Sequence, residues 1–250
     1  MATTHPTAAA GFARAADAYE RGRPAYPQDA VDHVAAALRL GPGAVVLDLA
    51  AGTGKLTRML VATGASVIAV EPVDAMREIL SHSVAGADVR AGAAEAIPAA
   101  DGSLDAVTVA QAFHWFDAAK ALADIHRVLR PGGGLALIWN SFDASVAWVA
   151  ALQALVHPHR RGEPHYSGAG WEETIDATGL FGPVSERTFG LVQELDTAGL
   201  IDRIGSTSYI AMLADPERER LFAEIRALVA GLPQPLRLPY RTDTFIACRA

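Results

Sequence analysis

The chain has 250 residues, 51% of them hydrophobic, and a formal net charge of −7 at neutral pH. These values fit one globular domain with a sizeable core, and an acidic chain without a basic run disfavours nucleic-acid duplexes and anionic membranes as partners. The single cysteine, the lack of a signal-like N-terminus and the lack of an apolar run of about 18 residues predict a cytoplasmic protein without an internal disulfide.

The N-terminal 27 residues divide into two parts. Residues 1–10 are small, polar and alanine-rich, which predicts a disordered lead. Residues 11–27 combine a short helical pattern with aromatic and arginine side chains, and they predict either a flap over a bound ligand or a helix packed on the domain edge. Because arginine recognises carboxylates well, we expect Tyr19, Arg23 and Tyr26 of the flap to close over a cofactor and a substrate acid.

Between residues 28 and 140, short apolar segments alternate with amphipathic helical patterns. Strands are predicted at 45–49, 66–71, 87–91, 104–110 and 135–140. Helices are predicted at 28–40, 54–63, 72–83 and 118–129, the last with Asp117 as its N-terminal capping residue. This alternation is typical of a parallel sheet with right-handed crossovers and with helices on both faces.

After residue 140 the alternation loosens. Helices are predicted at 145–156, 171–178, 197–213 and 215–230, with Asp196 as the capping residue of the third. Strands are predicted at 184–195 and 236–249, and Cys248 in the last strand is expected to be a small core residue. Residues 11–250 are therefore predicted to form one domain, in which about 141–235 contribute a cap over the substrate.

The most informative stretch is 45–57, where an apolar strand ends in an acid and two small residues before Gly52 and Gly54 open a helix. A turn with so few side chains lets the backbone approach a ligand closely. The stretch lacks the glycine pattern of a P-loop and the third glycine of a dinucleotide fingerprint. With Glu71 ending the next strand as an acceptor for ribose hydroxyls, it predicts a site for a nucleoside without a pyrophosphate. A plain strand-to-helix connection is the alternative interpretation of the turn alone.

Five stretches occur in the order found in one enzyme family. They are VLDLAAGTGKLT (46–57), AVEPVDAM (69–76), GAAEAIP (92–98), LDAVTVAQAFHWFD (104–117) and HRVLRPGGGLALIWN (126–140). Over nearly its whole length the chain resembles the class I S-adenosylmethionine-dependent methyltransferases, and YERGRPAYP (19–27) with AFHWFD (112–117) resembles the branch that includes trans-aconitate methyltransferase. The resemblance implies an α/β fold: a Rossmann-like, seven-stranded, mostly parallel sheet in the order 3-2-1-4-5-7-6, with strand 7 antiparallel and with helical cap elements.

The resemblance also implies S-adenosyl-L-methionine as the cofactor. Together with Tyr19 and Arg23 of the flap, the expected cofactor-binding residues are Asp48, Ala50, Gly52, Gly54, Glu71, Pro72, Met76, Ala94, Glu95 and Gln111. Within this set, Pro72 and Met76 are assigned to the flanks of the adenine, and Ala94 with Glu95 to its edge. Many relatives carry an aspartate where this chain has Ala93, which leaves Glu95 or a backbone group to accept from the adenine amino group.

The methyl group of a sulfonium is already activated, so the protein needs chiefly to align the acceptor and exclude water. His114 and Trp115 follow the fourth strand, near where the methyl group is expected to point, and are the predicted catalytic residues. His114 is expected either as a general base, which a hydroxyl acceptor needs and a carboxylate does not, or as an imidazole that only frames the pocket. The predicted substrate contacts are Tyr26, His114, Trp115 and Arg241, and the alternative for Arg241 is an exposed arginine on a strand without a substrate role.

The predicted activity is methyl transfer to a small-molecule metabolite, with O-methylation of a carboxylate or hydroxyl favoured. One alternative is a protein of this fold that binds the cofactor without transferring its methyl group. A nucleic-acid methyltransferase is disfavoured by the charge and by QAFHWF (111–116) after the fourth strand. No metal site is expected, because arginines and prolines interrupt the histidines of HPHRRGEPH (157–165). No membrane or nucleic-acid partner is expected, and the protein is a monomer or a dimer.

Overall fold

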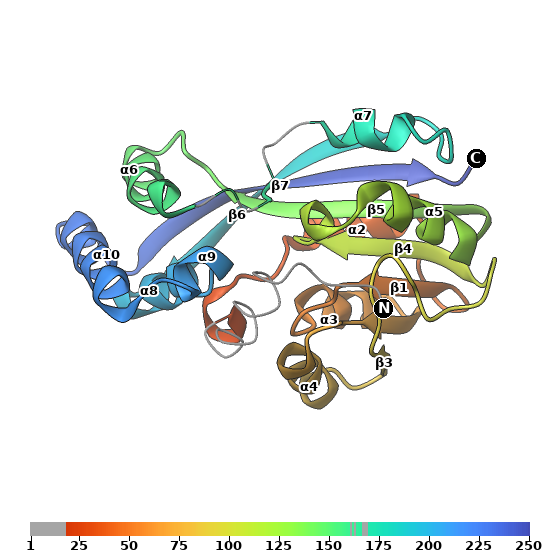
Figure 1. Cartoon of the computed structure of the whole chain (residues 1–250), viewed down its shortest axis with the longest axis horizontal. Helices are drawn as coiled ribbons and strands as arrows, with labels where there is room; N and C mark the ends of the chain where they lie inside the picture. The colour runs from red at the N-terminus through yellow and green to blue at the C-terminus, as the bar shows by residue number, and fades with distance from the viewer. Residues whose placement is uncertain (1–18, 161, 163, 167–169) are drawn as a thin grey trace.

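The computed structural model describes residues 19–160, 162, 164–166 and 170–250. The predicted lead and the first part of the predicted flap, residues 11–18, lie outside this described part of the chain. Helices lie on both faces of one long sheet (Figure 1). Within the described residues, no helix combines the length and the apolar character needed to cross a membrane.

The sheet has seven strands in the order β3-β2-β1-β4-β5-β7-β6. The strands are β1 (Val45–Leu49), β2 (Ser66–Val70), β3 (Ala87–Arg90), β4 (Leu104–Ala110), β5 (Leu129–Phe142), β6 (Ser185–Leu195) and β7 (Leu236–Cys248). Strands β1 to β5 pair in parallel, whereas β7 pairs antiparallel with both β5 and β6. This order and the antiparallel β7 confirm the architecture that the resemblance implied.

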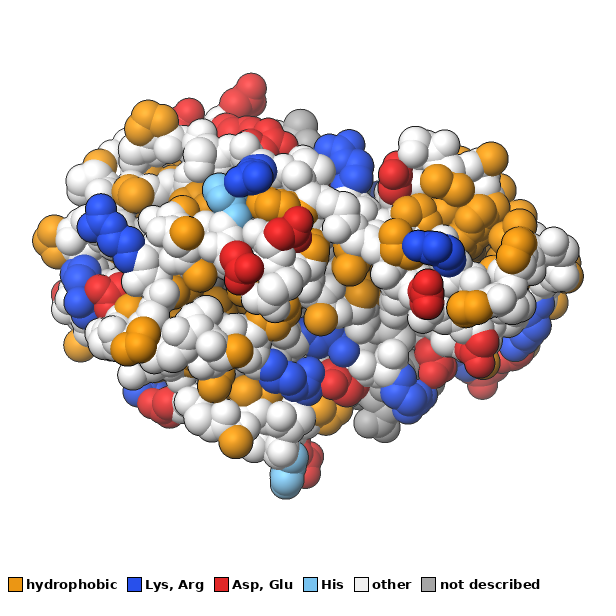
Figure 2. Space-filling view, turned by 180° about the vertical axis from the view of Figure 1, so that it is seen from behind, with side chains coloured by type: hydrophobic (Ala, Val, Ile, Leu, Met, Phe, Trp, Pro, Cys, Tyr) orange, Lys and Arg blue, Asp and Glu red, His pale blue; other side chains and the backbone are white. Residues whose placement is uncertain are grey.

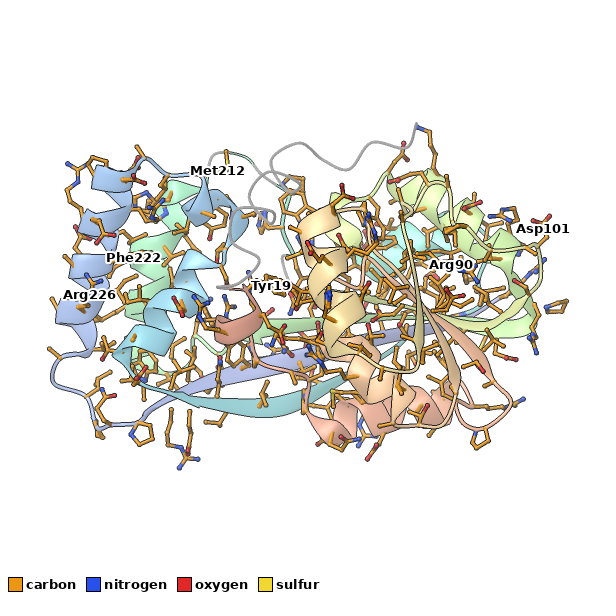
Figure 3. All side chains as sticks on the ribbon, turned by 90° about the horizontal axis from the view of Figure 1, so that it is seen from below. Tyr19, Arg90, Asp101, Met212, Phe222 and Arg226 are labelled. Atoms are coloured by element: carbon orange, nitrogen blue, oxygen red, sulfur yellow. The ribbon has the colours of Figure 1, made fainter. Side chains whose placement is uncertain are left out.

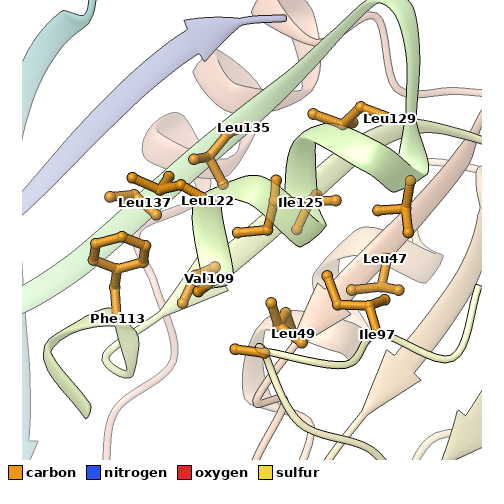
Figure 4. Close-up of a cluster of buried hydrophobic side chains, with 14 of the residues drawn as sticks. Leu47, Leu49, Ile97, Val109, Phe113, Leu122, Ile125, Leu129, Leu135 and Leu137 are labelled. Atoms are coloured by element: carbon orange, nitrogen blue, oxygen red, sulfur yellow. The ribbon is translucent and has the colours of Figure 1, made fainter. Parts of the chain in front are cut away.

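Helices cover both faces of the sheet because its central strands are apolar on both sides. The helices of this part are α2 (Gln28–Ala37), α3 (Lys55–Val61), α4 (Asp74–Ser83), α5 (Ala118–Val128) and α7 (Trp171–Asp176). Val34 of α2 and Leu60 of α3 are buried together on one face. On the other face, Leu122 and Ile125 of α5 are buried in the same cluster as Leu47 of β1 (Figure 4). The sheet therefore has an apolar core on each side.

Two helices begin at the capping residues that the sequence predicts. At the start of α5, Oδ1 of Asp117 accepts from the backbone N–H of Lys120 at 3.3 Å. At the start of α8 (Thr197–Gly205), Oδ1 of Asp196 accepts from the backbone N–H of Gly199 at 2.7 Å. Both predictions are confirmed, because each carboxylate satisfies an N–H group that the first helical turn leaves without an intrahelical partner.

A second group of helices gathers beside the Phe142 end of β5, away from α3, α4 and α5 (Figure 1). These cap helices are α6 (Ala147–Val156), α8, α9 (Ser208–Ala211) and α10 (Asp215–Val229). They bury Leu152, Leu200 and Ile225 in an apolar cluster distinct from the two on the sheet. Helix α7 lies within the same sequence range, but its Ile175 belongs to the cluster under α5, so α7 is part of the sheet layer.

Strand β5 is longer than predicted, because it begins at Leu129 and includes the glycine-rich stretch. A Cβ atom on Gly133 would lie 2.7 Å from the carbonyl oxygen of Asp105 in β4, so the absent side chain allows the two backbones to approach. The prediction for Cys248 is wrong: this residue ends β7 and is exposed.

The helix predicted at 197–213 is two helices, α8 and α9. Helix α8 ends at Gly205, and the hydroxyl of the next residue, Ser206, donates to the carbonyl oxygen of Arg203 at 2.7 Å. A serine that bonds back to the preceding turn competes with helix continuation. Ser206, which lies between the two helices in the sequence, is itself fully buried.

Candidate active site

The turn after β1 holds its backbone in the left-handed region at Ala50 (φ 57°), Gly52 (φ 59°) and Gly54 (φ 87°). Gln111, directly after β4, has a φ of 59°. Residues with a Cβ rarely adopt this conformation, so Ala50 and Gln111 are strained positions that the surrounding structure holds in place. Both line the same pocket at the carboxyl ends of the adjacent parallel strands β1 and β4, the edge where open α/β sheets bind ligands.

This pocket contains nine residues of the predicted cofactor set. They are Tyr19, Ala50, Gly52, Glu71, Pro72, Met76, Ala94, Glu95 and Gln111. The wall also includes Leu49, Val73, Ala112 and Phe116, which sequence reasoning missed although each lies beside a motif residue or within the AFHWFD stretch. Apolar side chains with a few polar groups are the usual lining of a small-molecule site.

Gly54 lies outside the pocket and serves packing instead. A Cβ atom there would lie 2.4 Å from Cδ1 of Leu80 and 2.7 Å from Cγ2 of Val84. Gly52, by contrast, lines the pocket. The two glycines of the turn therefore have different tasks: Gly52 leaves room on the ligand side, and Gly54 lets the start of α3 approach α4.

Glu71 closes the turn from the end of β2. Its Oε2 accepts from the backbone N–H of Gly52 at 2.8 Å, and its Oε1 accepts from that of Val73 at 2.7 Å. The side chain is buried, and this burial raises the pKa of Glu71 to about 7, although the two N–H donors favour the ionised form. Each carboxylate oxygen keeps a lone pair for a further donor.

Asp48 lies beneath the turn, next to a small hollow that also contains Tyr26 and Lys55. Its two oxygens accept from the hydroxyls of Thr57 at 2.6 Å and Thr108 at 3.2 Å. Burial raises the pKa of Asp48 to about 6. Neither Asp48 nor Tyr26 lines the larger cavity described below, so Tyr26 does not lie where its predicted substrate contact requires; it is buried with the core beside α3.

Glu95 has a structural partner as well as a place in the pocket wall. Its Oε1 accepts from the backbone N–H of Asp117 at 3.0 Å, directly before α5. Ala94 is buried, and Ala93 pairs with Ala96 in a single β-bridge. The loop that follows β3 is therefore held in a defined shape against the pocket.

Three residues, Tyr19, Gln111 and Trp115, line both this pocket and a neighbouring larger cavity. The side-chain amide of Gln111 donates to the carbonyl oxygen of Asn140 at 3.0 Å, and the side-chain amide of Asn140 donates to that of Ala25 at 3.1 Å. These bonds connect the ends of β4 and β5 with the N-terminal segment. The shared residues mark the boundary at which two bound molecules would meet.

The larger cavity has a volume of about 750 Å³ and lies between the sheet and the cap helices. Among the residues that the structure describes, its charged lining is mainly basic, with four arginines and one carboxylate: Arg23, Arg160, Arg203, Arg241 and Asp243. That carboxylate is already engaged, since Asp243 forms an ion pair with Arg241 at 3.4 Å and accepts from the hydroxyls of Tyr166 and Thr188 at 3.1 and 2.7 Å. On the face shown in Figure 2, acidic and basic side chains are interspersed and neither kind forms a large patch.

His114 lies on the wall of this cavity, in the 3₁₀ turn Phe113–Trp115 (η1) that follows β4. Burial, and then the charges of His165, Arg23 and Arg160, lower the pKa of His114 to about 4. Its Nδ1 is buried without a hydrogen-bond partner among the residues that the structure describes. The imidazole is therefore neutral at physiological pH and has an unused polar atom.

The N-terminal segment, from residue 19 to residue 27, connects helix α3 to the cap helices. The carboxylate of Glu20 accepts from Arg58 at 2.9 Å, and the ammonium of Lys55 donates to the carbonyl oxygen of Glu20 at 2.7 Å. On the other side, Arg21 forms an ion pair with Asp202 of α8 at 3.0 Å. Tyr19 directly precedes Glu20. In Figure 3 it lies between the cap helices and the part of the molecule that they do not cover.

Arg23 lines the larger cavity and not the pocket. Its Nε donates to the hydroxyl of Ser206 at 3.0 Å, and its guanidinium lies 5.0 Å from the ring centre of Tyr19. Burial, and next the charge of Arg203, lower the pKa of Arg23 to about 10. The group stays charged at neutral pH, and Arg23 lines the second compartment beside Tyr19, which lines both; its predicted contact with the cofactor stays a prediction.

Residues 47–137 match the family model of the methyltransferase domain. An uncharacterized methyltransferase of Mycobacterium tuberculosis is 39% identical over 238 residues, which cover 92% of both chains. A malonyl-[acyl-carrier protein] O-methyltransferase of Methylococcus capsulatus is 38% identical over 133 residues, which cover 50% of this chain and 48% of that one.

A solved structure of geranyl diphosphate methyltransferase in complex with SAM matches with a TM-score of 0.52 and 16% identity, over 89% of this chain and 85% of that one. At this identity the match shows a common fold alone. The sequence match over nearly the whole mycobacterial chain establishes the relationship, and it agrees with the strand order and with the pocket at the ends of β1 and β4. The chain therefore belongs to the methyltransferase family and has its class I fold.

Proposed function

We propose that the protein transfers the methyl group of S-adenosylmethionine to an oxygen of a small molecule, and that this oxygen belongs to a carboxylate. The observation that carries the proposal is the pairing of two compartments. A chiefly apolar pocket at the ends of β1 and β4 shares Tyr19, Gln111 and Trp115 with a basic cavity under the cap helices. A nucleoside in the first compartment and an acid in the second would meet at these shared residues.

Glu71 is the residue we assign to the ribose. Its oxygens already hold the turn through Gly52 and Val73, each can accept a further hydrogen bond, and Glu71 lines the pocket. Pro72 and Met76 border the same pocket and are assigned to the base. Asp48 and Gly54 act on the cofactor through the turn that they support.

Bound S-adenosylmethionine supplies a methyl group on a positively charged sulfur, which an oxygen nucleophile takes in a single displacement. The chain contributes position: Gln111 is fixed by its bond to Asn140, and Trp115 and Tyr19 form walls of both compartments. Alignment of this kind contributes about 7 to 11 kcal/mol to such reactions.

A carboxylate is favoured over a hydroxyl because the cavity offers a poor general base. An alcohol must lose its proton around the transfer, and an imidazole with a pKa of about 4 gains little from accepting it. A carboxylate is already ionised at neutral pH and is attracted by the arginines of the cavity. In this proposal His114 and Trp115 form the part of the cavity wall against which the acceptor packs.

Three comparisons support the proposal. The geranyl diphosphate methyltransferase of the same fold was solved with SAM bound. The Methylococcus relative is an O-methyltransferase by name. The stretches 19–27 and 112–117 resemble the branch of trans-aconitate methyltransferase, whose substrate is an acid.

The test combines binding and turnover. Calorimetry with S-adenosylhomocysteine measures whether the first compartment holds the nucleoside. Incubation with methyl-labelled S-adenosylmethionine and a panel of small acids, their amides and matched alcohols is expected to yield methyl esters from the acids alone. Binding without product from any compound would favour the non-catalytic alternative, and label in added RNA would favour the nucleic-acid alternative.

A further inference from the structure

Arg203 on α8 is a buried guanidinium in the wall of the basic cavity, with only 6% of its surface exposed. Its Nε donates to the hydroxyl of Tyr240 at 2.9 Å, and that hydroxyl donates to Oε1 of Gln193 at 2.8 Å. The guanidinium lies 4.6 Å from the ring centre of Phe142. One edge of the group is therefore fixed, and its orientation is set by packing.

No acidic side chain pairs with Arg203 in the described part of the chain. Arg127 forms ion pairs with Asp124 and Asp101, both at 2.6 Å. The charge of Arg203 is, after burial, the next cause that lowers the pKa of Arg23, so these two cations lie close enough to repel each other. A buried cation without a counter-ion is costly, and two adjacent ones are more so.

We infer that Arg203 is the anchor for an anionic group of the substrate, a carboxylate or a phosphate, that is separate from the methyl-accepting oxygen. This inference rests on the proposed function and adds a second anionic group to it. The outer nitrogens of Arg203 make no hydrogen bond with the residues described, and a guanidinium offers two such N–H groups side by side to an oxyanion. Arg23, which lies near Tyr19 at the compartment boundary, flanks the same anion.

A substrate of this kind has two ends. The anchored end neutralises the two buried cations on the cap side, and the accepting end reaches the shared residues near His114. Neutral compounds of the same length leave the buried charges unpaired and bind weakly. The cavity therefore selects small molecules with two acidic groups over monoacids.

The test uses the full-length protein saturated with S-adenosylhomocysteine, with glutarate, inorganic phosphate and the neutral analogue glutaramide as probes. We expect calorimetry to detect glutarate and not glutaramide, and phosphate binding shows whether a phosphate group is also accepted at the anchor. In Arg203→Met, glutarate affinity falls by about tenfold or more, the usual effect of losing a charge-assisted hydrogen bond. Arg187→Met is the matched control, because Arg187 lies on β6 outside the cavity and stacks on Phe189.

Thermal stability distinguishes the anchor role of Arg203 from a purely structural role, in which its loss would destabilise the fold itself. If the group is an unpaired cation, Arg203→Met melts no more than about 5 °C below the wild type in the absence of anions, and glutarate raises the melting temperature of the wild type only. Arg203→Lys keeps the charge and retains part of the glutarate affinity. A larger loss of stability in Arg203→Met, equal weakening by the two substitutions, or glutarate binding that survives in Arg203→Met would overturn the inference.

The same experiment separates this inference from the proposed function. Absence of S-adenosylhomocysteine binding contradicts the proposed function. Normal S-adenosylhomocysteine binding with neither glutarate nor phosphate binding contradicts the anion anchor alone. In all variants the affinity for S-adenosylhomocysteine is expected to stay within about twofold of the wild type, since Arg203 does not line the first pocket.

Discussion

At the scale of single residues, Glu71 is a buried carboxylate whose ionisation falls in the physiological range. Its pKa of about 7 results from burial, and an ionised Glu71 accepts more hydrogen bonds than a protonated one. We expect the affinity for S-adenosylhomocysteine to decrease as the pH falls through about 7, because the protonated form is the wrong acceptor for ribose hydroxyls. Calorimetry at several pH values measures this.

Glu71→Gln is the control for that pH dependence. It removes the ionisation and is expected to weaken binding by about tenfold or more, with little remaining dependence on pH near 7. If the pH dependence persists in the variant, it belongs to another group, and Asp48, with a pKa of about 6, is the next candidate.

His114 offers a second test at this scale. We predict that His114→Asn lowers kcat for the best acid substrate by less than about tenfold, whereas removal of a true general base costs about 100-fold to 10,000-fold. The reason is that the lowered pKa of His114 makes it a weak base. Steady-state kinetics would show the contrary by a loss in the larger range, which would favour a hydroxyl acceptor.

The residues of the first pocket could largely be predicted because they belong to contiguous motifs at strand ends. Arg203 could not be predicted in this way. It reaches the cavity only because α8 packs on β7 and on Phe142, and nothing in its local sequence distinguishes it from a surface arginine. The same holds for Arg160, which follows α6. Their roles depend on tertiary packing, which local pattern does not encode.

At the scale of elements, the start of α3 depends on the absence of a side chain at Gly54. We predict that Gly54→Ala destabilises the protein by about 2 to 5 kcal/mol, of which about 1 to 2 come from the left-handed conformation and the rest from overlap with Leu80. Gly132→Ala is the matched control, because Gly132 also has a positive φ (78°) but has nothing within 4 Å of the added Cβ. Urea denaturation compares the two; equal losses would mean that the contact with Leu80 relaxes easily.

The positions of the strands and helices could be predicted well from the sequence, because the strands of the sheet and the helices that cover it have regular apolar patterns. The exceptions have local physical causes. Glycines usually end a pattern, yet here Gly133 continues β5 because its missing side chain admits the backbone of β4. Ser206 ends α8 through a side-chain bond that helical spacing does not reveal.

At the scale of the whole molecule, the separate apolar cluster of the cap helices predicts a separate response to destabilisation. Leu221→Ala in α10 is expected to accelerate amide exchange in α6, α8 and α10 and to weaken glutarate binding, with little change in S-adenosylhomocysteine affinity. Leu122→Ala in α5 removes a similar buried side chain from the sheet cluster and is expected to destabilise the protein by about 2 to 5 kcal/mol. Hydrogen exchange with mass spectrometry resolves the two patterns.

Identical exchange patterns in the two variants would contradict this division. They would mean that the cap helices and the sheet unfold as one cooperative unit despite their separate clusters.

The net charge of −7 did not predict the basic cavity, because a formal total does not say where charges lie.

At Gly22 the backbone of the N-terminal segment packs closely against the backbone of α8. A Cβ atom at this position would lie 2.6 Å from the backbone nitrogen of Arg203, so main chain touches main chain there. Even the methyl group of an alanine would overlap with α8. We expect it to displace this helix together with the guanidinium of Arg203. We therefore expect Gly22→Ala to change the affinity for glutarate through the position of Arg203, although Gly22 itself lies outside the cavity lining.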